Sequence, residues 1–140
     1  MKINTTEIQV RYQETDMMGV VYHANYLIWF EIGRTSLIEE FGFSYKEMED
    51  AGIVSPVTDV RVSFQKPVRY GDQVSVRTWI AEYTGVKTTY AYEVVHHDGT
   101  VAVTGSSDHV LVKKDTFRPT SLRKAFPTWH ETYKLAVEQD

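Results

Sequence analysis

Residues 24–42 read ANYLIWFEIGRTSLIEEFG, and this stretch decides the fold. One set of its residues recurs every three or four positions, the spacing of a helix: Tyr26, Leu27, Phe30, Gly33, Leu37, Ile38 and Phe41. Gly42 stands where such a helix would end. Ile28, Trp29 and Ile32 widen the apolar face to most of the circumference. Because a helix that is apolar nearly all round must be surrounded by protein, we expect a long buried helix here.

After this helix the polarity of the chain alternates with a period of two, as in half-buried strands. The alternation covers four runs, residues 57–65, 74–81, 86–94 and 101–112. Turn sequences separate the runs, and one of them, Asp98-Gly99, is typical of a hairpin. The chain also holds 18 Val and 15 Thr but only 5 Leu, and β-branched side chains favour strands. We therefore expect four consecutive antiparallel strands.

The fourth run changes phase along its length. Val101 and Val103 occupy odd positions, whereas Val110 and Val112 occupy even ones. Since a shift of one residue turns every side chain to the other face of a sheet, we expect a β-bulge near Gly105-Ser106. A strand of about 12 residues, roughly 40 Å long, is also expected to curl.

The two ends of the chain complete this layout. Residues 7–13 alternate and predict a fifth strand, and residues 44–51 predict a short helix after the long one. Residues 121–124 predict a turn, and residues 127–138 predict a terminal helix. These elements fit an α+β fold in which a long, curled antiparallel sheet wraps around the central helix. The open edge and the second face of such a sheet need a cover, so we expect dimerisation.

Length and composition restrict the class of protein. With 140 residues, 42% of them hydrophobic, we expect a single domain over residues 1–140. No apolar run approaches the roughly 20 residues that span a bilayer, and residues 1–7 lack the apolar stretch of a secretion signal. A cytoplasmic protein without a membrane span is therefore expected. The absence of Cys excludes a thiol nucleophile, and the net charge of −4 argues against nucleic-acid binding.

The segment between the first strand and the long helix, residues 11–26, combines acids, a glycine and a Tyr-His pair. A helix start offers free backbone N–H groups and a positive dipole end, which suit the oxyanion of acyl transfer. A nearby carboxylate such as Asp16 suits a nucleophile or a general base. On spacing alone, however, a simple turn begun by Asp16 and permitted by Gly19 is the favoured interpretation.

A resemblance changes that balance. The segment carries the motif Tyr12-x-x-Thr15-Asp16-x-x-Gly19-Val20-Val21-Tyr22-His23-x-Asn25-Tyr26. This motif resembles the signature of the 4-hydroxybenzoyl-CoA thioesterase (4HBT) branch of the hotdog superfamily, particularly the YbgC-like acyl-CoA thioesterases. Glu31 and Arg34 on the helix and Phe64-x-x-Pro67-x-x-Tyr70-Gly71-Asp72 extend the likeness. The resemblance implies a single hotdog thioesterase domain that hydrolyses acyl-coenzyme A to a carboxylic acid and coenzyme A.

The resemblance also implies catalytic roles. Asp16 would be the catalytic carboxylate, which either attacks the thioester carbonyl or activates water. The backbone N–H of His23 would hold the carbonyl oxygen, and Gly19 would let the loop approach the substrate. The His23 imidazole could position water or the thiol leaving group. For Glu14, a solvated loop acid is the favoured interpretation.

Further residues are implied in substrate binding. Tyr22 and Tyr26 adjoin the site, although packing is the simpler interpretation of both. Glu31 would face the acyl tunnel, although an ion pair with Arg34 accounts equally well for an acid at this position. Ser55 and Thr58 would reach the site from the facing subunit of a homodimer, which could itself pair into a dimer of dimers.

Because coenzyme A carries phosphates, a cluster of basic residues is a candidate for binding them. Lys113, Lys114 and Arg118 are the candidates, although solvated surface explains any single one of them. Neither a metal nor a separate cofactor is expected, since coenzyme A is part of the substrate. The adjacent His96 and His97 would point to opposite faces of a strand and could not share one ion.

Two other functions stay open. A non-catalytic acyl-CoA-binding or sensing module would gain nothing from a carboxylate beside the thioester, so Asp16 argues against it. A hotdog hydratase or dehydratase would carry a His–Asp or His–Glu set that is placed differently. The motif does not select the acyl group, the route taken by Asp16, or a dimer over a tetramer.

Overall fold

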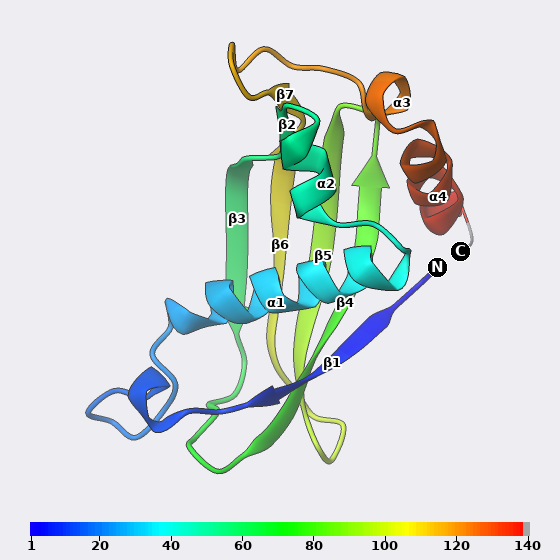
Figure 1. Ribbon diagram of the computed structural model, residues 1–140. Coiled ribbons are helices and arrows are strands. Elements are labelled where there is room, and N and C mark those ends of the chain that lie inside the picture. The colour runs from blue at the N-terminus through cyan, green and yellow to red at the C-terminus, as the bar shows by residue number, and fades with distance from the viewer. Residues whose placement is uncertain (139–140) are drawn as a thin grey trace.

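A computed structural model describes residues 1–138, and its core is one long helix lying across one face of an antiparallel sheet (Figure 1). The sheet has the order β1-β4-β5-β6-β3, and every neighbouring pair is antiparallel. Its strands are β1 (Asn4–Gln9), β3 (Val57–Phe64), β4 (Gln73–Tyr83), β5 (Lys87–His96) and β6 (Val101–Val110). The helix is α1 (Asn25–Glu40). The α+β architecture and the four consecutive strands are therefore confirmed.

Smaller elements surround this core. They are the 3₁₀ turn η1 (Tyr12–Glu14), α2 (Tyr45–Asp50), β2 (Ile53–Val54), β7 (Val112–Lys113), α3 (Leu122–Ala125) and α4 (Pro127–Glu138). β2 pairs with β7 in a two-stranded sheet beyond one end of the main sheet (Figure 1). α4 buries Trp129, which stacks on Phe43 with ring centroids 4.8 Å apart. Among the described residues, no helix is long and apolar enough to cross a membrane.

The helix rests on the sheet through very close contacts. The ring of Phe30 stacks on Tyr92 of β5, with centroids 4.3 Å apart and planes 4° from parallel. Beside it lies Gly105 of β6, where a Cβ atom would stand 2.5 Å from the Phe30 ring and 2.7 Å from the Arg61 carbonyl oxygen. On the helix itself, a Cβ at Gly33 would overlap the Thr78 side chain of β4. Glycine on both elements lets helix and sheet approach.

The outer side of α1 is not covered by the chain. Leu27, Ile28 and Ile32 are each 43–45% exposed, because the sheet packs on the opposite side of the helix. The prediction of a helix buried all round is therefore wrong for a single chain. An apolar face of this kind is typical of a contact with another molecule.

Strand β3 forms a second uncovered surface. It lies at the edge of the sheet, and all of its side chains except Val62 are exposed. They include Val57, Val60 and Phe64. In the described part of the chain, no strand pairs with the outer edge of β3. Such an edge is a template for pairing with another strand.

Two predictions about the strands were wrong. The first strand was predicted over residues 7–13, but β1 begins at Asn4 and ends at Gln9, and residues 12–14 form η1. The predicted bulge near Gly105-Ser106 does not occur. Instead the register shifts where Val94 pairs with Val103 and Val95 pairs with Val101, which leaves Ala102 as the extra residue.

The bulge was misplaced because polar and small side chains continue the inward face of β6. Ser107 and His109 are buried together with Val103, whereas Val110 is only half-buried. Hydrophobicity along this strand therefore does not report which residues point inward.

Replacing Gly105 with Ala tests the close contact of helix and sheet. We expect the Gly105→Ala variant to lose about 1–3 kcal/mol of unfolding free energy in urea, because its methyl group overlaps Phe30. The neighbouring Ser106→Ala change, on the other side of the strand, should stay within about 0.5 kcal/mol of the parent protein. Equal stability of the two variants would contradict the contact.

Candidate active site

The motif segment folds into a small hairpin that projects from the end of the sheet. Thr15 and Val21 pair as an isolated bridge, and Val20 pairs with Arg69. Between them the Asp16 N–H donates to the Val20 carbonyl at 2.9 Å, and the Gly19 N–H donates to the Asp16 carbonyl at 3.0 Å. Gly19 has φ +79°, a conformation that glycine adopts without strain. The hairpin thus depends on Gly19, as expected for a turn.

The Asp16 carboxylate is half-exposed at the base of this turn. Its Oδ1 accepts the Met18 N–H at 2.8 Å, which fixes the side chain on the loop. Within residues 1–138, no Lys, Arg or His lies at ion-pair distance from it. The carboxylate is therefore oriented by the loop, without an ion pair among the described residues.

The start of α1 presents backbone donors next to this hairpin. The Tyr22 N–H donates to the Glu14 carbonyl and the Asn25 N–H donates to the Tyr22 carbonyl. The N–H groups of His23 and Ala24, between them, donate to no protein acceptor among the described residues. No side chain caps the helix at Ala24. Two free donors at the positive end of the helix can stabilise an anionic oxygen.

Aromatic side chains gather beside these donors. The rings of Tyr22 and His23 lie 4.4 Å apart, and the His23 ring meets the edge of Phe64 on β3 at 6.4 Å. Tyr26 contacts the same Phe64 at 5.7 Å. Tyr26 is buried, whereas Tyr22, His23 and Phe64 are exposed. An exposed aromatic surface therefore borders the helix start.

The prediction that Glu14 is a solvated loop acid is wrong. Glu14 is only 4% exposed, and its carboxylate accepts hydrogen bonds from Trp29 Nε1 at 2.9 Å and the Arg11 N–H at 2.7 Å. The available signal was Trp29, since a buried indole N–H on α1 needs an acceptor.

The predicted pairing of Glu31 with Arg34 is not formed. Glu31 is exposed on the outer side of α1. Arg34 instead donates to the hydroxyls of Tyr45 at 3.2 Å and Tyr92 at 3.1 Å. On the helix, Glu31 therefore faces solvent, whereas Arg34 faces the tyrosine hydroxyls.

Arg34 begins a chain of hydrogen bonds with a defined direction. Arg34 donates to the Tyr92 hydroxyl, which is hydrogen-bonded to Ser107 Oγ at 2.6 Å and donates to it if Ser107 donates to His109. Ser107 then donates to His109 Nε2 at 2.8 Å, and His109 Nδ1 donates to the Ser55 carbonyl at 3.4 Å. This order requires a neutral His109. Burial, aided by the positive charge of Arg34, lowers the pKa of His109 to about 4.

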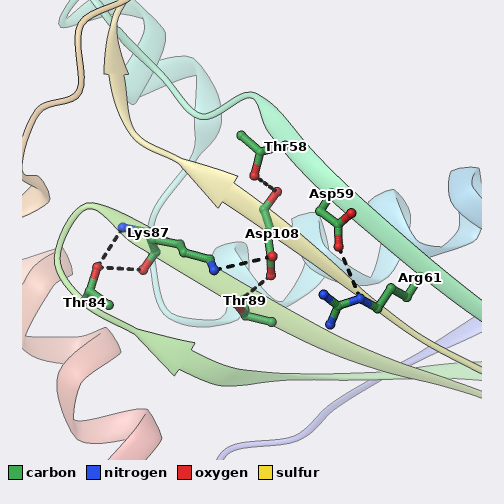
Figure 2. A network of polar contacts seen from close by, with 7 residues as sticks. All are labelled: Thr58, Asp59, Arg61, Thr84, Lys87, Thr89 and Asp108. Carbon is green, nitrogen blue, oxygen red and sulfur yellow. Dashed lines mark hydrogen bonds and ion pairs between the residues drawn. The ribbon is translucent and has the colours of Figure 1, made fainter.

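The remaining candidates lie at the far end of the sheet. Ser55 precedes β3, and Thr58 near its beginning donates to the Asp108 carbonyl at 3.3 Å (Figure 2). Figure 1 places this end of β3 opposite the Asp16 hairpin. Figure 2 also shows the polar neighbours of Thr58, in which Asp108 accepts from Thr89 and Lys87. One chain therefore does not bring Ser55 or Thr58 to Asp16.

The basic cluster occupies the same far end. Lys113 belongs to β7, while Lys114 follows it and pairs with Glu49 at 3.2 Å. Lys113 and Arg118 are joined by a backbone hydrogen bond, and all three basic side chains are exposed. β7 and the hairpin that precedes α1 lie at opposite ends of the main sheet (Figure 1).

An antiparallel sheet with one long helix packed across its face is the hotdog fold that thioesterases share. Residues 10–130 match the model of the thioesterase-like superfamily, and the chain belongs to that family. It is 48% identical to the Bacillus subtilis protein YneP, provisionally named an acyl-CoA thioesterase, over 97% of this chain and 99% of YneP.

Two further relatives agree with this membership. The acyl-CoA thioester hydrolase YbgC of Escherichia coli O157:H7 is 27% identical over 88% of this chain and 95% of its own. The crystal structure of a DHNA-CoA thioesterase from Staphylococcus aureus superposes with a TM-score of 0.93 at 46% identity. That match covers 96% of this chain and 91% of the Staphylococcus aureus protein.

The buried His109 predicts a pH dependence of stability. Between pH 6.5 and about 4 the unfolded chain binds a proton at this histidine and the folded chain does not, so acid favours unfolding. We expect the His109→Gln variant to lose less stability than the parent protein over this range, by up to about 3 kcal/mol. Urea unfolding at pH 7, 5.5 and 4.5 measures it. If the exposed His97→Gln change had the same effect, His109 would not be the source.

Proposed function

We propose that this protein hydrolyses acyl-CoA thioesters to a carboxylic acid and free coenzyme A. The observation that carries the proposal is that one hairpin holds the Asp16 carboxylate, which has no ion-pair partner among the described residues, and leads directly into the His23 and Ala24 N–H groups, which donate to no described acceptor at the helix start. Thioester hydrolysis needs both parts, a nucleophile or base and a donor for the developing oxyanion. The likeness to YneP over nearly the whole chain supports the same reaction.

In the proposed mechanism the thioester carbonyl oxygen accepts from the His23 N–H. Asp16 then attacks the carbonyl carbon, or removes a proton from a water that attacks it. The tetrahedral oxyanion is stabilised by the same N–H and by the dipole of α1. Its collapse breaks the carbon–sulfur bond, and the coenzyme A thiolate takes up a proton, from solvent on the first route and from the protonated Asp16 on the second, which restores the carboxylate. On the first route, water subsequently hydrolyses the Asp16 anhydride and restores the carboxylate.

An aromatic acyl group is the proposed substrate class. The Staphylococcus aureus relative, at 46% identity, is named for a DHNA-CoA substrate. In this chain the rings of Tyr22, His23 and Phe64 form an exposed surface beside the proposed oxyanion site. A flat ring can stack on such a surface or meet it edge-on.

We further propose that two chains pair along their β3 edges around a two-fold axis. Antiparallel pairing would bring the far end of one sheet beside the Asp16 hairpin of the other chain. Ser55 and Thr58 of the partner subunit would then border the acyl group, and the partner's Lys113 would approach the coenzyme A phosphates. The uncovered apolar face of α1 offers a second contact for a dimer of dimers.

The Asp16→Asn variant tests the reaction. We expect a folded protein whose kcat falls by about two to four orders of magnitude, because the amide is neither a nucleophile nor a base. Free-thiol release from aromatic and from short, medium and long aliphatic acyl-CoAs measures both activity and substrate class. Asp50→Asn, at an exposed acid on α2, is the control and should keep full activity. Wild-type protein that binds these esters without turnover would refute the proposal.

The dimer is tested at the exposed β3 edge. Val60→Asp would place a charge in each copy of the proposed interface, so we expect monomers in sedimentation. We also expect the activity to fall at least tenfold, which corresponds to a rise of about 1.4 kcal/mol in the activation free energy. Leu135→Asp, at an exposed apolar residue of α4, should change neither property. A fully active wild-type monomer would contradict a shared site.

A further inference from the structure

Glu14 occupies an unusual position for an acid, because it is buried at the base of the Asp16 hairpin. The 3₁₀ turn Tyr12–Glu14 directs its side chain inward beneath the first turns of α1. Removing a carboxylate from water is unfavourable unless hydrogen bonds replace the water. The contacts that compensate Glu14 therefore indicate what the acid does.

The side chain of Glu14 binds two donors from different elements. Oε2 accepts the Trp29 indole N–H at 2.9 Å, and Trp29 is one of the most deeply buried residues of α1. Oε1 accepts the backbone N–H of Arg11 at 2.7 Å. The exposed Arg11 guanidinium lies 3.6 Å from Oε2 and offsets the charge. One side chain thus ties the end of the first strand to the second turn of the helix.

The backbone of Glu14 adds two more bonds to the same helix. Its carbonyl oxygen accepts the Tyr22 N–H at 2.8 Å and Asn25 Nδ2 at 2.8 Å. Tyr22 directly precedes His23, and Asn25 is the first residue of α1. Glu14 itself lies two residues before Asp16. We call this set of bonds the Glu14 clamp; its members are Arg11, Glu14, Tyr22, Asn25 and Trp29.

We propose that Glu14 is a positioning residue that sets the distance between the Asp16 carboxylate and the His23 N–H. The clamp fixes the chain on both sides of the hairpin to one helix, so the two arms that carry Asp16 and His23 cannot move apart without breaking it. This inference rests on the proposed function for its kinetic consequence. The geometric part, a hairpin held by Glu14, stands without it.

Two nearly isosteric variants test the clamp. Glu14→Gln places an NH₂ group against one of the two donors, and Trp29→Phe keeps a ring but removes the indole N–H. We expect each to lower kcat by about 10–100-fold, with KM within about twofold, because a displaced carboxylate still lets substrate bind. The double variant should be no slower than the slower single variant, since both remove one interaction. Glu7→Gln, at an exposed acid, and Trp79→Phe, at a half-buried indole, make the same chemical changes outside the clamp and are the controls.

Amide hydrogen exchange supplies a readout that does not depend on activity. In Glu14→Gln we expect residues 15–24 to exchange at least tenfold faster, on the order of 1.4 kcal/mol of lost protection, with β4, β5 and β6 unchanged. Unchanged kcat and unchanged local exchange would overturn the proposal. A uniform rise in exchange across the sheet in both variants would also overturn it, because Glu14 would then support only the fold. If wild-type protein cleaves no acyl-CoA, the proposed function fails and local exchange alone decides the clamp.

Discussion

The contact between α1 and the sheet at Phe30, Tyr92 and Gly105 is the constraint on which the rest of the structure depends. It brings the helix so near to β6 that a single methyl group at Gly105 would not fit. Because the helix is held there, its first turn is fixed at the β3 side of the sheet, where the Asp16 hairpin projects (Figure 1). The proposed oxyanion donors are located by this packing, since they belong to the backbone at the helix start.

The arrangement of elements could be predicted because the apolar residues of the sequence recur with two different periods, one typical of a helix and one typical of strands. The three-and-four spacing of residues 24–42 and the alternation after residue 57 leave few folds in which both are buried. Prediction failed where the inward face is not apolar. On β6 that face is continued by Gly105, Ser107 and His109. Gly105 makes room for the Phe30 ring, while Ser107 and His109 belong to the hydrogen-bond chain from Arg34.

The candidate site divides in the same way. Asp16, Gly19 and His23 could be proposed from the sequence because they lie in one short segment whose motif resembles a known family, although spacing alone indicated only a turn. Glu14 could not, because its bond to Trp29 joins residues 15 positions apart and depends on which way the helix faces. Ser55 and Thr58 were proposed through resemblance alone, and in one chain they lie at the other end of the sheet.

The tip of the hairpin has a consequence for how such a protein can evolve. Met17 is fully exposed and Met18 nearly so, and neither belongs to the packed core. Substitutions at these two positions are nearly neutral for stability, in contrast to changes at Glu14 or Trp29 below them. The exposed tip of the hairpin can therefore change in sequence with little effect on stability, whereas its buried base cannot. Tolerant and intolerant positions are thus separated by only a few residues of one hairpin.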